Sequence, residues 1–218
     1  MAFQVASDPH RWPSAAHASP ADWAVIVVDM QHDYCTPGFY IVKAGYDTAR
    51  LREPIPRIAD VLSVTRHSGL HIIYTQQGRL RTPPETPPGA EAAQPSFPPT
   101  ARRGEPAWEI VPELAAQQRD VVLQKNTINA FFSGVLAEIL AEASVHHLAF
   151  CGNTIDVCVH STLRAGVDLG YDCLLLTHCS GAADDDLHRW AAASVKVENG
   201  VFGTIATAAA FLQALRCV

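Results

Sequence analysis

The sequence predicts a three-layer α/β fold with a six-stranded, mainly parallel sheet and helices on both faces. Apolar runs of strand length alternate with amphipathic segments of helix length along most of the 218 residues. The first run, residues 23–30 (WAVIVVDM), is rich in β-branched residues and lacks polar alternation, as in a strand buried on both faces. Apolar residues make up 48% of the chain, which is ample for one buried core. Buried strands alternating with helices are typical of a parallel sheet covered on both sides.

Five further segments have the length and composition of strands. They are residues 71–75 (HIIYT), 121–125 (VVLQK), 147–151 (HLAFC), 171–177 (YDCLLLT) and 201–206 (VFGTIA). Helices are predicted where apolar residues recur at helical spacing or where good helix formers accumulate. They are residues 54–67, 131–143, 157–169, 185–197 and 208–215. A sheet of this kind places its ligands beyond the carboxyl ends of the strands.

We expect a single domain over residues 23–218, preceded by an N-terminal extension over residues 1–22. Residues 76–105 interrupt the pattern, because they are rich in proline and have no periodicity. A connection this long inside a compact domain is usually either functional or disordered. A solvated excursion is the alternative, but the segment leaves the carboxyl end of the second strand, so we favour a lid or pocket wall.

Composition excludes several classes of partner. The net charge is −6 and the charges are scattered without a basic stripe, so neither nucleic acid nor an anionic membrane is an expected partner. No apolar run approaches the roughly 18 residues of a membrane helix, and the N-terminus does not read as a secretory signal, so we expect a cytoplasmic protein. The six cysteines form no CxxC pair and the ten histidines show no zinc-site spacing, so no metal or other cofactor is expected.

Three residues suited to catalysis lie at or just beyond strand ends. Asp29 ends the first strand, Lys125 ends the third, and Cys158 opens the helix after the fourth. A thiol at a helix start lies near unpaired N–H groups and the positive end of the dipole, which lower its pKa. Asp29 is suited to be its base, and Lys125 to stabilise the anions. Taken singly, each has a plainer explanation, as a core cysteine, a capping acid or a solvated lysine; their coincidence at one sheet edge favours a nucleophilic site.

Three segments carry a resemblance to a known family. In order along the chain, they resemble the three signatures of the isochorismatase-like cysteine hydrolases, and the likeness covers most of the chain from Trp23 onward. They are residues 28–33 (VDMQHD), 124–131 (QKNTINAF) and 152–159 (GNTIDVCV). Within this family, the chain is most similar to the biuret amidohydrolase branch, through residues 45–47 (GYD), 53–55 (EPI) and 200–203 (GVFG).

The resemblance implies Cys158 as the nucleophile, Asp29 as the base and Lys125 as the electrostatic partner. It also implies an oxyanion hole formed by the N–H groups of Thr154 and Cys158, with a cis peptide bond just before Thr154. Family members usually assemble, so a homodimer or homotetramer is expected. The nicotinamidase branch binds a metal after its second strand, but Gln76-Gln77-Gly78 offers no such ligands here.

Substrate contacts are assigned to residues within or beside these motifs and to two positions that depart from the branch. They are Gln31, Tyr34, Arg79, Phe131, Asn153 and Glu198. Relatives in the biuret branch commonly carry a glutamine near the position of Glu198. A pocket acid there suits a donor-rich or cationic substrate, whereas the alternative is a solvated residue at a helix end.

We therefore predict a hydrolase that cleaves a C–N bond of a small amide or linear ureide, such as biuret or guanylurea. The reaction releases ammonia through a covalent intermediate on Cys158. The alternatives are an isochorismatase-type ether hydrolase and a ureidoacrylate-type amidohydrolase. A binding protein with a degenerate site is disfavoured, because the aspartate, lysine and cysteine are all present.

Overall fold

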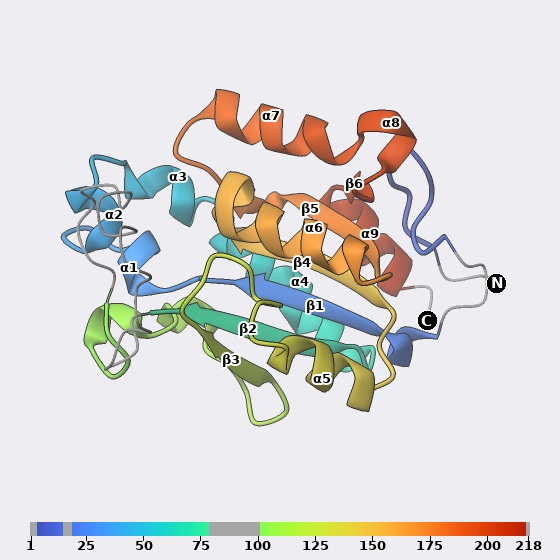
Figure 1. The fold of residues 1–218 in the computed structure, drawn as a ribbon, viewed down its shortest axis with the longest axis horizontal. Helices are drawn as coiled ribbons and strands as arrows, with labels where there is room; N and C mark the ends of the chain where they lie inside the picture. Colours follow the sequence, from blue (N-terminus) through green and yellow to red (C-terminus); the bar gives the residue numbers. More distant parts are fainter. Residues whose placement is uncertain (1–3, 15–18, 79–100, 217–218) are drawn as a thin grey trace, which may run out of the picture.

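Six parallel strands form one sheet in the computed structural model, which describes residues 4–14, 19–78 and 101–216 (Figure 1). The strands are β1 (Trp23–Val28), β2 (His71–Gln77), β3 (Val121–Lys125), β4 (His147–Asn153), β5 (Asp172–Gly181) and β6 (Thr204–Ala206). Their order is β3-β2-β1-β4-β5-β6, and every neighbouring pair is parallel. The predicted α/β sheet is confirmed.

Helices cover both faces of the sheet, as predicted. One face carries α4 (Ile55–His67) and α9 (Ala208–Leu215). The other carries α5 (Val135–Glu142), α6 (His160–Asp168) and α7 (Asp185–Val195), which lie in front of the sheet in Figure 1. None of the described helices is both long and apolar enough to cross a membrane.

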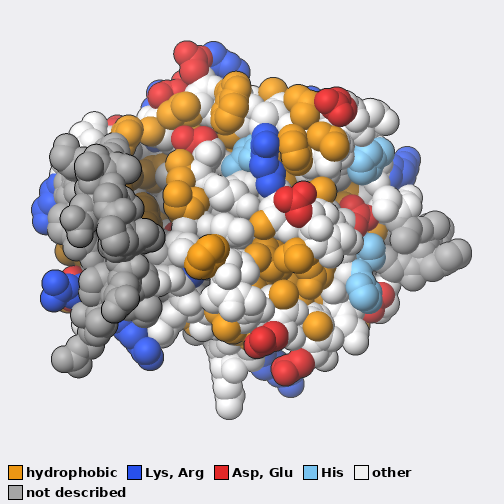
Figure 2. Space-filling view, viewed as in Figure 1, with side chains coloured by type: hydrophobic (Ala, Val, Ile, Leu, Met, Phe, Trp, Pro, Cys, Tyr) orange, Lys and Arg blue, Asp and Glu red, His pale blue; other side chains and the backbone are white. Residues whose placement is uncertain are grey.

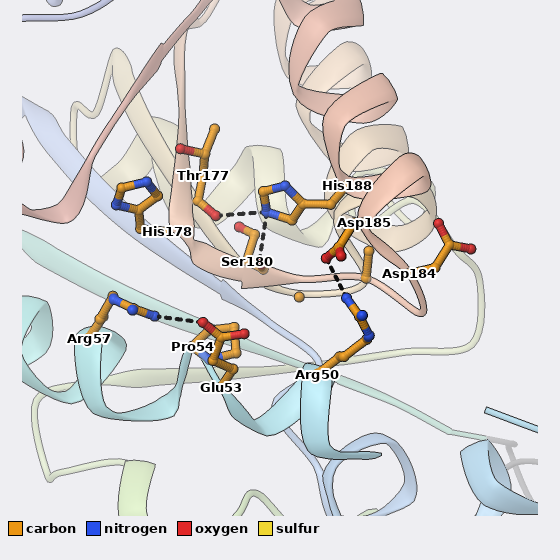
Figure 3. Close-up of a pocket in the computed structure, with 12 residues that line it drawn as sticks. Arg50, Glu53, Pro54, Arg57, Thr177, His178, Ser180, Asp184, Asp185 and His188 are labelled. Atoms are coloured by element: carbon orange, nitrogen blue, oxygen red, sulfur yellow. Dashed lines mark hydrogen bonds and ion pairs between the residues drawn. The ribbon is translucent and has the colours of Figure 1, made fainter. Parts of the chain in front are cut away.

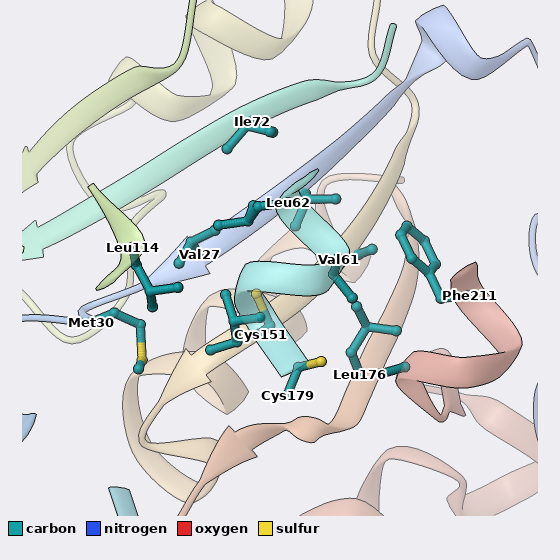
Figure 4. Close-up of a cluster of buried hydrophobic side chains, with 14 of the residues drawn as sticks. Val27, Met30, Val61, Leu62, Ile72, Leu114, Cys151, Leu176, Cys179 and Phe211 are labelled. Atoms are coloured by element: carbon teal, nitrogen blue, oxygen red, sulfur yellow. The ribbon is translucent and has the colours of Figure 1, made fainter. Parts of the chain in front are cut away.

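The two layers of core follow from the alternation of side chains along each strand. In β1, Val25 and Val27 face α4 and α9, whereas Ala24 and Ile26 face α5, α6 and α7. Because both faces are covered, all six residues of β1 are buried and the strand reads as a continuous apolar run. Figure 4 shows part of the first layer, where Phe211 of α9 packs in the same cluster as β1 and α4.

The strand order places a crevice between β1 and β4. From β1 the chain moves outward to β2 and β3, and it then returns to add β4, β5 and β6 on the other side. Connections therefore leave the carboxyl ends of β1 and β4 in opposite directions, which opens a ligand crevice at that point. Asp29 directly follows β1 and Cys158 follows β4, so two of the three predicted catalytic residues flank this switch point.

Several element boundaries differ from the predictions for local reasons. β1 stops at Val28 because Asp29 takes a left-handed backbone conformation (φ 48°). The predicted helix over residues 131–143 begins only at Val135, after Gly134 with φ 83°. The predicted helix over residues 185–197 stops at Val195, and a separate short turn, α8 (Val197–Gly200), follows.

Residues 29–53 hold three short helices that no sequence pattern predicted. They are α1 (His32–Cys35), α2 (Tyr40–Lys43) and α3 (Thr48–Arg52). Single 3-10 turns occur at Pro20–Asp22, Pro106–Trp108 and Pro112–Leu114. Figure 1 shows α1, α2 and α3 gathered at the carboxyl end of the sheet. Helices of four or five residues are too short to show a periodic apolar face, because one turn takes about 3.6 residues.

The segment expected as an N-terminal extension, residues 1–22, packs onto the domain where it is described. Asp8 forms an antiparallel bridge with Ile205 of β6, so this segment covers the edge strand. Trp12 is fully buried, with its ring 4.4 Å from that of Trp23. Of the proposed lid, residues 79–100 lie outside the described residues, and only the ends of residues 76–105 can be placed.

Hydrophobic side chains are also exposed on the face that carries α5, α6 and α7 (Figure 2). The largest of them on α7 is Trp190, which is 59% exposed and stacks on His160. Exposed apolar surface of this kind is typical of protein contacts when it is contiguous. The expected homodimer or homotetramer stays a prediction.

Candidate active site

A buried ion pair joins Asp29 and Lys125 at the carboxyl edge of the sheet. Lys125 Nζ lies 2.7 Å from Asp29 Oδ2, and the two side chains are 3% and 0% exposed. Lys125 ends β3, which is separated from β1 by β2, so the long lysine side chain spans the intervening strand. Charges are almost never fully buried unless they are paired, so this arrangement is typical of a functional site.

Cys158 completes the group of three. Its thiol lies within hydrogen-bonding reach of both Asp29 and Lys125. The helix predicted to begin at residue 157 begins at His160 as α6. It follows a wider π turn, Ile155–Val159, and Cys158 lies inside this turn. π turns of this kind occur frequently at functional sites. The structure thus brings all three predicted catalytic residues together, although Asp29 and Cys158 lie 129 positions apart in sequence.

The resting thiol is protonated, contrary to the expectation from its position in the helix. Burial raises the pKa of Cys158, and the negative charge of Asp29 raises it further, whereas Lys125 acts in the opposite direction. The expected lowering by the helix dipole is therefore wrong for the free protein, because desolvation of the thiolate outweighs it. A protonated thiol next to a carboxylate needs that carboxylate as its base.

Two residues of β2 hold the ion pair in place, and sequence reasoning missed both. The Thr75 hydroxyl donates a hydrogen bond to Asp29 Oδ1 at 2.6 Å. Lys125 Nζ donates to Gln77 Oε1 at 2.7 Å and to the carbonyl oxygen of Thr127 at 3.0 Å. Both β2 residues lie at the carboxyl end of their strand, so the argument that found Asp29 and Lys125 applies to them as well.

A cavity of about 340 Å³ opens above the thiol. Its wall is formed mainly by aromatic and aliphatic side chains from the short helices, with polar groups near the cysteine. The lining residues are Tyr34, Tyr40, Ile41, Tyr46, Leu51, Gln77, Ile128, Thr154, Asp156, Val157, Cys158, Ala183 and Leu187. A mostly apolar cavity with a few convergent polar groups is the usual form of a small-molecule site. Tyr40 and Tyr46 were not predicted, because they lie in the segment without periodic pattern.

The residues expected to form the oxyanion hole both line this cavity. The peptide bond between Asn153 and Thr154 is cis, as the resemblance implies. Thr154 precedes the π turn as its N-cap, and its carbonyl oxygen accepts hydrogen bonds from the N–H groups of Val157 and Val159. The oxyanion hole itself stays a prediction.

Of the predicted substrate contacts, Tyr34 alone among the described ones lines the cavity. Burial raises the pKa of its hydroxyl well above the usual range, and the charges of Asp29 and Cys158 raise it further, which places the hydroxyl near the catalytic group. Tyr34 is therefore a neutral hydroxyl in the free protein, able to donate a hydrogen bond to a bound carbonyl.

Three other predicted contacts support the framework instead of lining the cavity. Gln31 donates to the carbonyl oxygens of Gln77 and Trp108, at 3.0 Å and 2.7 Å, so its amide holds β2 against residues 105–110. Asn153 donates to the carbonyl oxygen of Leu51 at 3.0 Å and thereby fixes α3 to the end of β4. Phe131 is buried in the core and stacks on a tyrosine ring. The sequence motif identified the positions, but the direction of each side chain depends on the fold.

Glu198, another predicted contact, is not brought to the cavity. Glu198 is exposed and lies in α8 before β6 begins, with a left-handed backbone (φ 51°). Since β6 is parallel to β5, the turn before it lies at the amino end of the strands (Figure 1). The chain therefore returns to the edge opposite the catalytic one. Arg79 lies outside the described residues.

No three histidine, cysteine, aspartate or glutamate side chains gather as a metal ion requires, within the part of the chain that the structure describes. The ammonium group of Lys125 pairs with Asp29, and the charges of both residues act on Cys158. The site brings together a thiol, a carboxylate and an ammonium group.

Comparison with known proteins agrees with this geometry. The ureidoacrylate amidohydrolase of Caulobacter segnis is 33% identical over 222 aligned positions, covering 91% of this chain and 88% of the relative. That of Azorhizobium caulinodans is 32% identical over 215 positions, covering 93% and 94%. A cysteine hydrolase from Pseudomonas syringae pv. phaseolicola has a similar structure, with a TM-score of 0.77 and 25% identity over 95% of this chain and 96% of that one.

These relatives correct one expectation, because they are ureidoacrylate amidohydrolases and not members of the biuret branch. Of the short segments that favoured the biuret branch, residues 45–47 contribute Tyr46 to the cavity wall, whereas residues 200–203 lie before β6 at the opposite edge of the sheet. The isochorismatase domain matches residues 23–210, which include all three strand ends of the site. This chain therefore belongs to the isochorismatase family.

Proposed function

We propose that this protein is a cysteine amidohydrolase that cleaves a C–N bond of a ureido group or a small linear amide. The observation that carries this proposal is the buried Lys125–Asp29 ion pair beside the protonated thiol of Cys158. A thiol, its base and a cation at one point are the components of covalent acyl transfer. The relatives named ureidoacrylate amidohydrolase support the ureido group as the reacting part.

In the first half of the reaction, Asp29 takes the proton of Cys158 as the sulfur attacks the carbonyl carbon. Burial disfavours a free thiolate in the empty site, so proton transfer and attack are coupled. Lys125 keeps its charge beside both groups and stabilises the negative charge that moves from carboxylate to sulfur and then to the carbonyl oxygen. Asp29 then returns the proton to the leaving nitrogen as the C–N bond breaks, which releases ammonia or an amine.

In the second half, water enters the place of the departed nitrogen. Asp29, again a carboxylate, takes one proton from this water, whose oxygen attacks the acyl carbon. The C–S bond breaks, and Asp29 returns the proton to Cys158. The same carboxylate thus serves as base and acid in each half, which requires that its position be fixed; the hydrogen bond from Thr75 supplies this restraint.

The carbonyl oxygen is expected to lie against the N–H groups of Thr154 and Cys158. Backbone donors fixed before the reaction stabilise charge as it develops and need no reorganisation. The π turn supports this assignment, because it positions Cys158 and Thr154 on the same wall of the cavity. Tyr34 is a further donor at this wall.

The substrate itself is assigned at the level of the reacting group. Ureidoacrylate, biuret and guanylurea all carry a terminal carbamoyl group that fits a cavity of about 340 Å³. The names of the relatives favour ureidoacrylate. Of the motifs that favoured biuret, Tyr46 alone lines the cavity, and Glu198, which favoured guanylurea, does not line it. All three belong in the first panel of test compounds.

The test is an ammonia-release assay on this panel, combined with mass analysis of acid-quenched protein. We expect turnover of at least one ureido compound and an acyl adduct on the peptide that contains Cys158. Cys158→Ala and Cys158→Ser should both lose turnover and keep the wild-type melting temperature, because a hydroxyl is much harder to ionise than a thiol.

A protein that cleaves an ether, as in the isochorismatase-type alternative, would release no ammonia and would form no adduct. Turnover of ureido compounds that survives in Cys158→Ala would overturn the covalent mechanism. Cys173→Ala is a matched control, because this cysteine is also buried but lies at the start of β5, away from the cavity.

A further inference from the structure

One charged side chain lines the catalytic cavity among the described residues. It is Asp156, which lies two residues before Cys158 inside the π turn. The other lining groups are tyrosines, aliphatic side chains and uncharged polar groups, while Lys125 and Asp29 are already paired with each other. In a cavity with apolar walls, a single charge acts over a longer range than it would in water. Asp156 therefore makes the largest contribution to the electrostatic potential at the unreactive end of a bound substrate.

The carboxylate of Asp156 has no partner that would neutralise it. Its Oδ1 atom is buried and accepts no hydrogen bond, and no ion pair to Asp156 occurs within residues 4–14, 19–78 and 101–216. Buried polar atoms nearly always have a hydrogen-bond partner, so an exception at the wall of a ligand cavity needs an explanation. A donor supplied by the ligand provides one.

The nearby His160 does not supply the missing charge. Its Nδ1 accepts a hydrogen bond from Arg164 at 3.0 Å, so its other ring nitrogen is the protonated one and faces Ser194 Oγ at 2.6 Å. Burial lowers the pKa of His160, and the charge of Arg164 lowers it further. Arg164 is itself occupied, since its guanidinium also lies over the ring of Phe202 at 3.8 Å. The negative charge of Asp156 is thus available to a ligand.

A neighbouring pocket shows the contrasting case (Figure 3). This pocket, of about 280 Å³, contains more charges than the catalytic cavity, but four of them form two ion pairs, and Asp184 accepts a hydrogen bond from the N–H group of Leu187. Arg50 forms an ion pair with Asp185, and Arg57 lies 3.5 Å from Glu53. Charges that are already paired are not available to bind a ligand, so this pocket gives no comparable indication of a binding site.

We propose that Asp156 binds the end of the substrate remote from the scissile bond and selects an N–H-bearing end, uncharged or cationic, over a carboxylate. This inference rests on the proposed function and specifies its substrate class. A ureidoacrylate carries a carboxylate at its remote end, which Asp156 repels, and no lysine or arginine lines the described cavity to receive it. Asp156 thus disfavours a ureidoacrylate as the substrate of this chain.

The test uses three ureas that share the reacting group and differ in the charge of the remote end. They are 3-ureidopropionate (anionic), 3-ureidopropionamide (neutral) and 2-aminoethylurea (cationic). For each, kcat/KM is measured with the wild-type protein, with Asp156→Asn and with Glu53→Gln. The last variant is the matched control, because it removes one exposed negative charge outside the catalytic cavity.

We expect the wild-type protein to prefer the cationic and neutral ureas over the anionic one. Asp156→Asn should lower kcat/KM for 2-aminoethylurea about 10–100-fold relative to 3-ureidopropionate, the size of one lost charge-assisted hydrogen bond. Glu53→Gln should leave the ratio unchanged. An equal change for the cationic and anionic ureas, or an equal shift in the control, overturns the role of Asp156. If Asp156→Asn does not fold, Asp156→Ser removes the same charge with a smaller side chain.

Failure of the proposed function can be told apart from failure of this inference. If no urea is hydrolysed, Kd values for the three ureas are measured by calorimetry on the Cys158→Ala protein, with and without Asp156→Asn. Binding of the cationic urea that weakens about tenfold or more in the double variant supports Asp156 even then. Equal binding of the three compounds, or no binding of any, overturns it.

Discussion

The ion pair between Asp29 and Lys125 can be broken by Lys125→Met, which keeps the length of the side chain and removes its charge. At 2.7 Å, the attraction between the two charges is about 6 kcal/mol for an effective dielectric constant of 20. Desolvation of both groups offsets part of this attraction. Removing the lysine leaves the carboxylate of Asp29, 0% exposed, without its cation, and such an uncompensated charge destabilises a fold by about 3–5 kcal/mol.

The remaining hydrogen bond from Thr75 to Asp29 Oδ1 limits the destabilisation in Lys125→Met. We therefore expect its free energy of unfolding to fall by an amount near the lower end of that range, about 3 kcal/mol. The double variant Asp29→Asn/Lys125→Met should recover part of it, because the buried carboxylate is then neutral. The double-mutant cycle should give a coupling free energy of about 2–3 kcal/mol. All three variants should be inactive, since each lacks a group that the mechanism uses.

Urea denaturation followed by circular dichroism measures the four free energies of unfolding, and unchanged m-values show that the denatured state is comparable. The control is the same cycle at Arg57 and Glu53, an exposed pair of the i,i+4 type, where the coupling should not exceed about 0.5 kcal/mol. A coupling at Asp29 and Lys125 as small as in the control would refute the reasoning. A Lys125→Met protein that is as stable as the wild type would do so more directly.

Three other outcomes are expected. Because the charge of Asp29 raises the pKa of Cys158, Asp29→Asn should increase the thiolate fraction near pH 8. Iodoacetamide should then label Cys158 faster than in the wild type, although turnover is lost. Slower labelling would contradict this role of Asp29. Gly152→Ala should lower the free energy of unfolding by more than about 2 kcal/mol, because a Cβ there would lie 2.2 Å from the Val28 carbonyl oxygen. Gly170→Ala is the control, since Gly170 also has a positive φ but has open space around it, and it should lower the free energy of unfolding about half as much in the same urea denaturation. Dialysis against a chelator should leave ammonia release unchanged, and a loss that zinc restores would show that a metal takes part.

The sequence by itself predicted the layered α/β fold, because each of its signals is local. A buried strand such as residues 23–28 shows an unbroken apolar run, and a covering helix shows apolar residues at helical spacing. Parallel strands all end at one edge, so Asp29 and Lys125 could be placed together from the ends of their strands alone. The same rule applied to β2 points to Thr75 and Gln77, which the structure shows in contact with that pair.

The direction of side chains at that edge was decided by tertiary structure. Gln31 and Asn153 lie within motif segments, yet their amides bind backbone carbonyl groups of distant segments and not the cavity. The cavity wall comes instead from Tyr40 and Tyr46, which lie on or beside short helices without a periodic pattern. A side chain's target depends on which segments pack against it, and no local spacing encodes that.

Protonation and charge at the site also depend on contacts between distant segments. The position of Cys158 near a helix start indicated a low pKa, but its burial and the nearness of Asp29 raise it. Glu198 could be either a pocket acid or a solvated residue at a helix end from its sequence, and the parallel direction of β6 places it at the edge opposite the catalytic one. Asp156, two residues from the nucleophile, lines the cavity instead. The sequence shows which charged groups are present, whereas desolvation and the distance between charges, which set their effect, exist only in the folded chain.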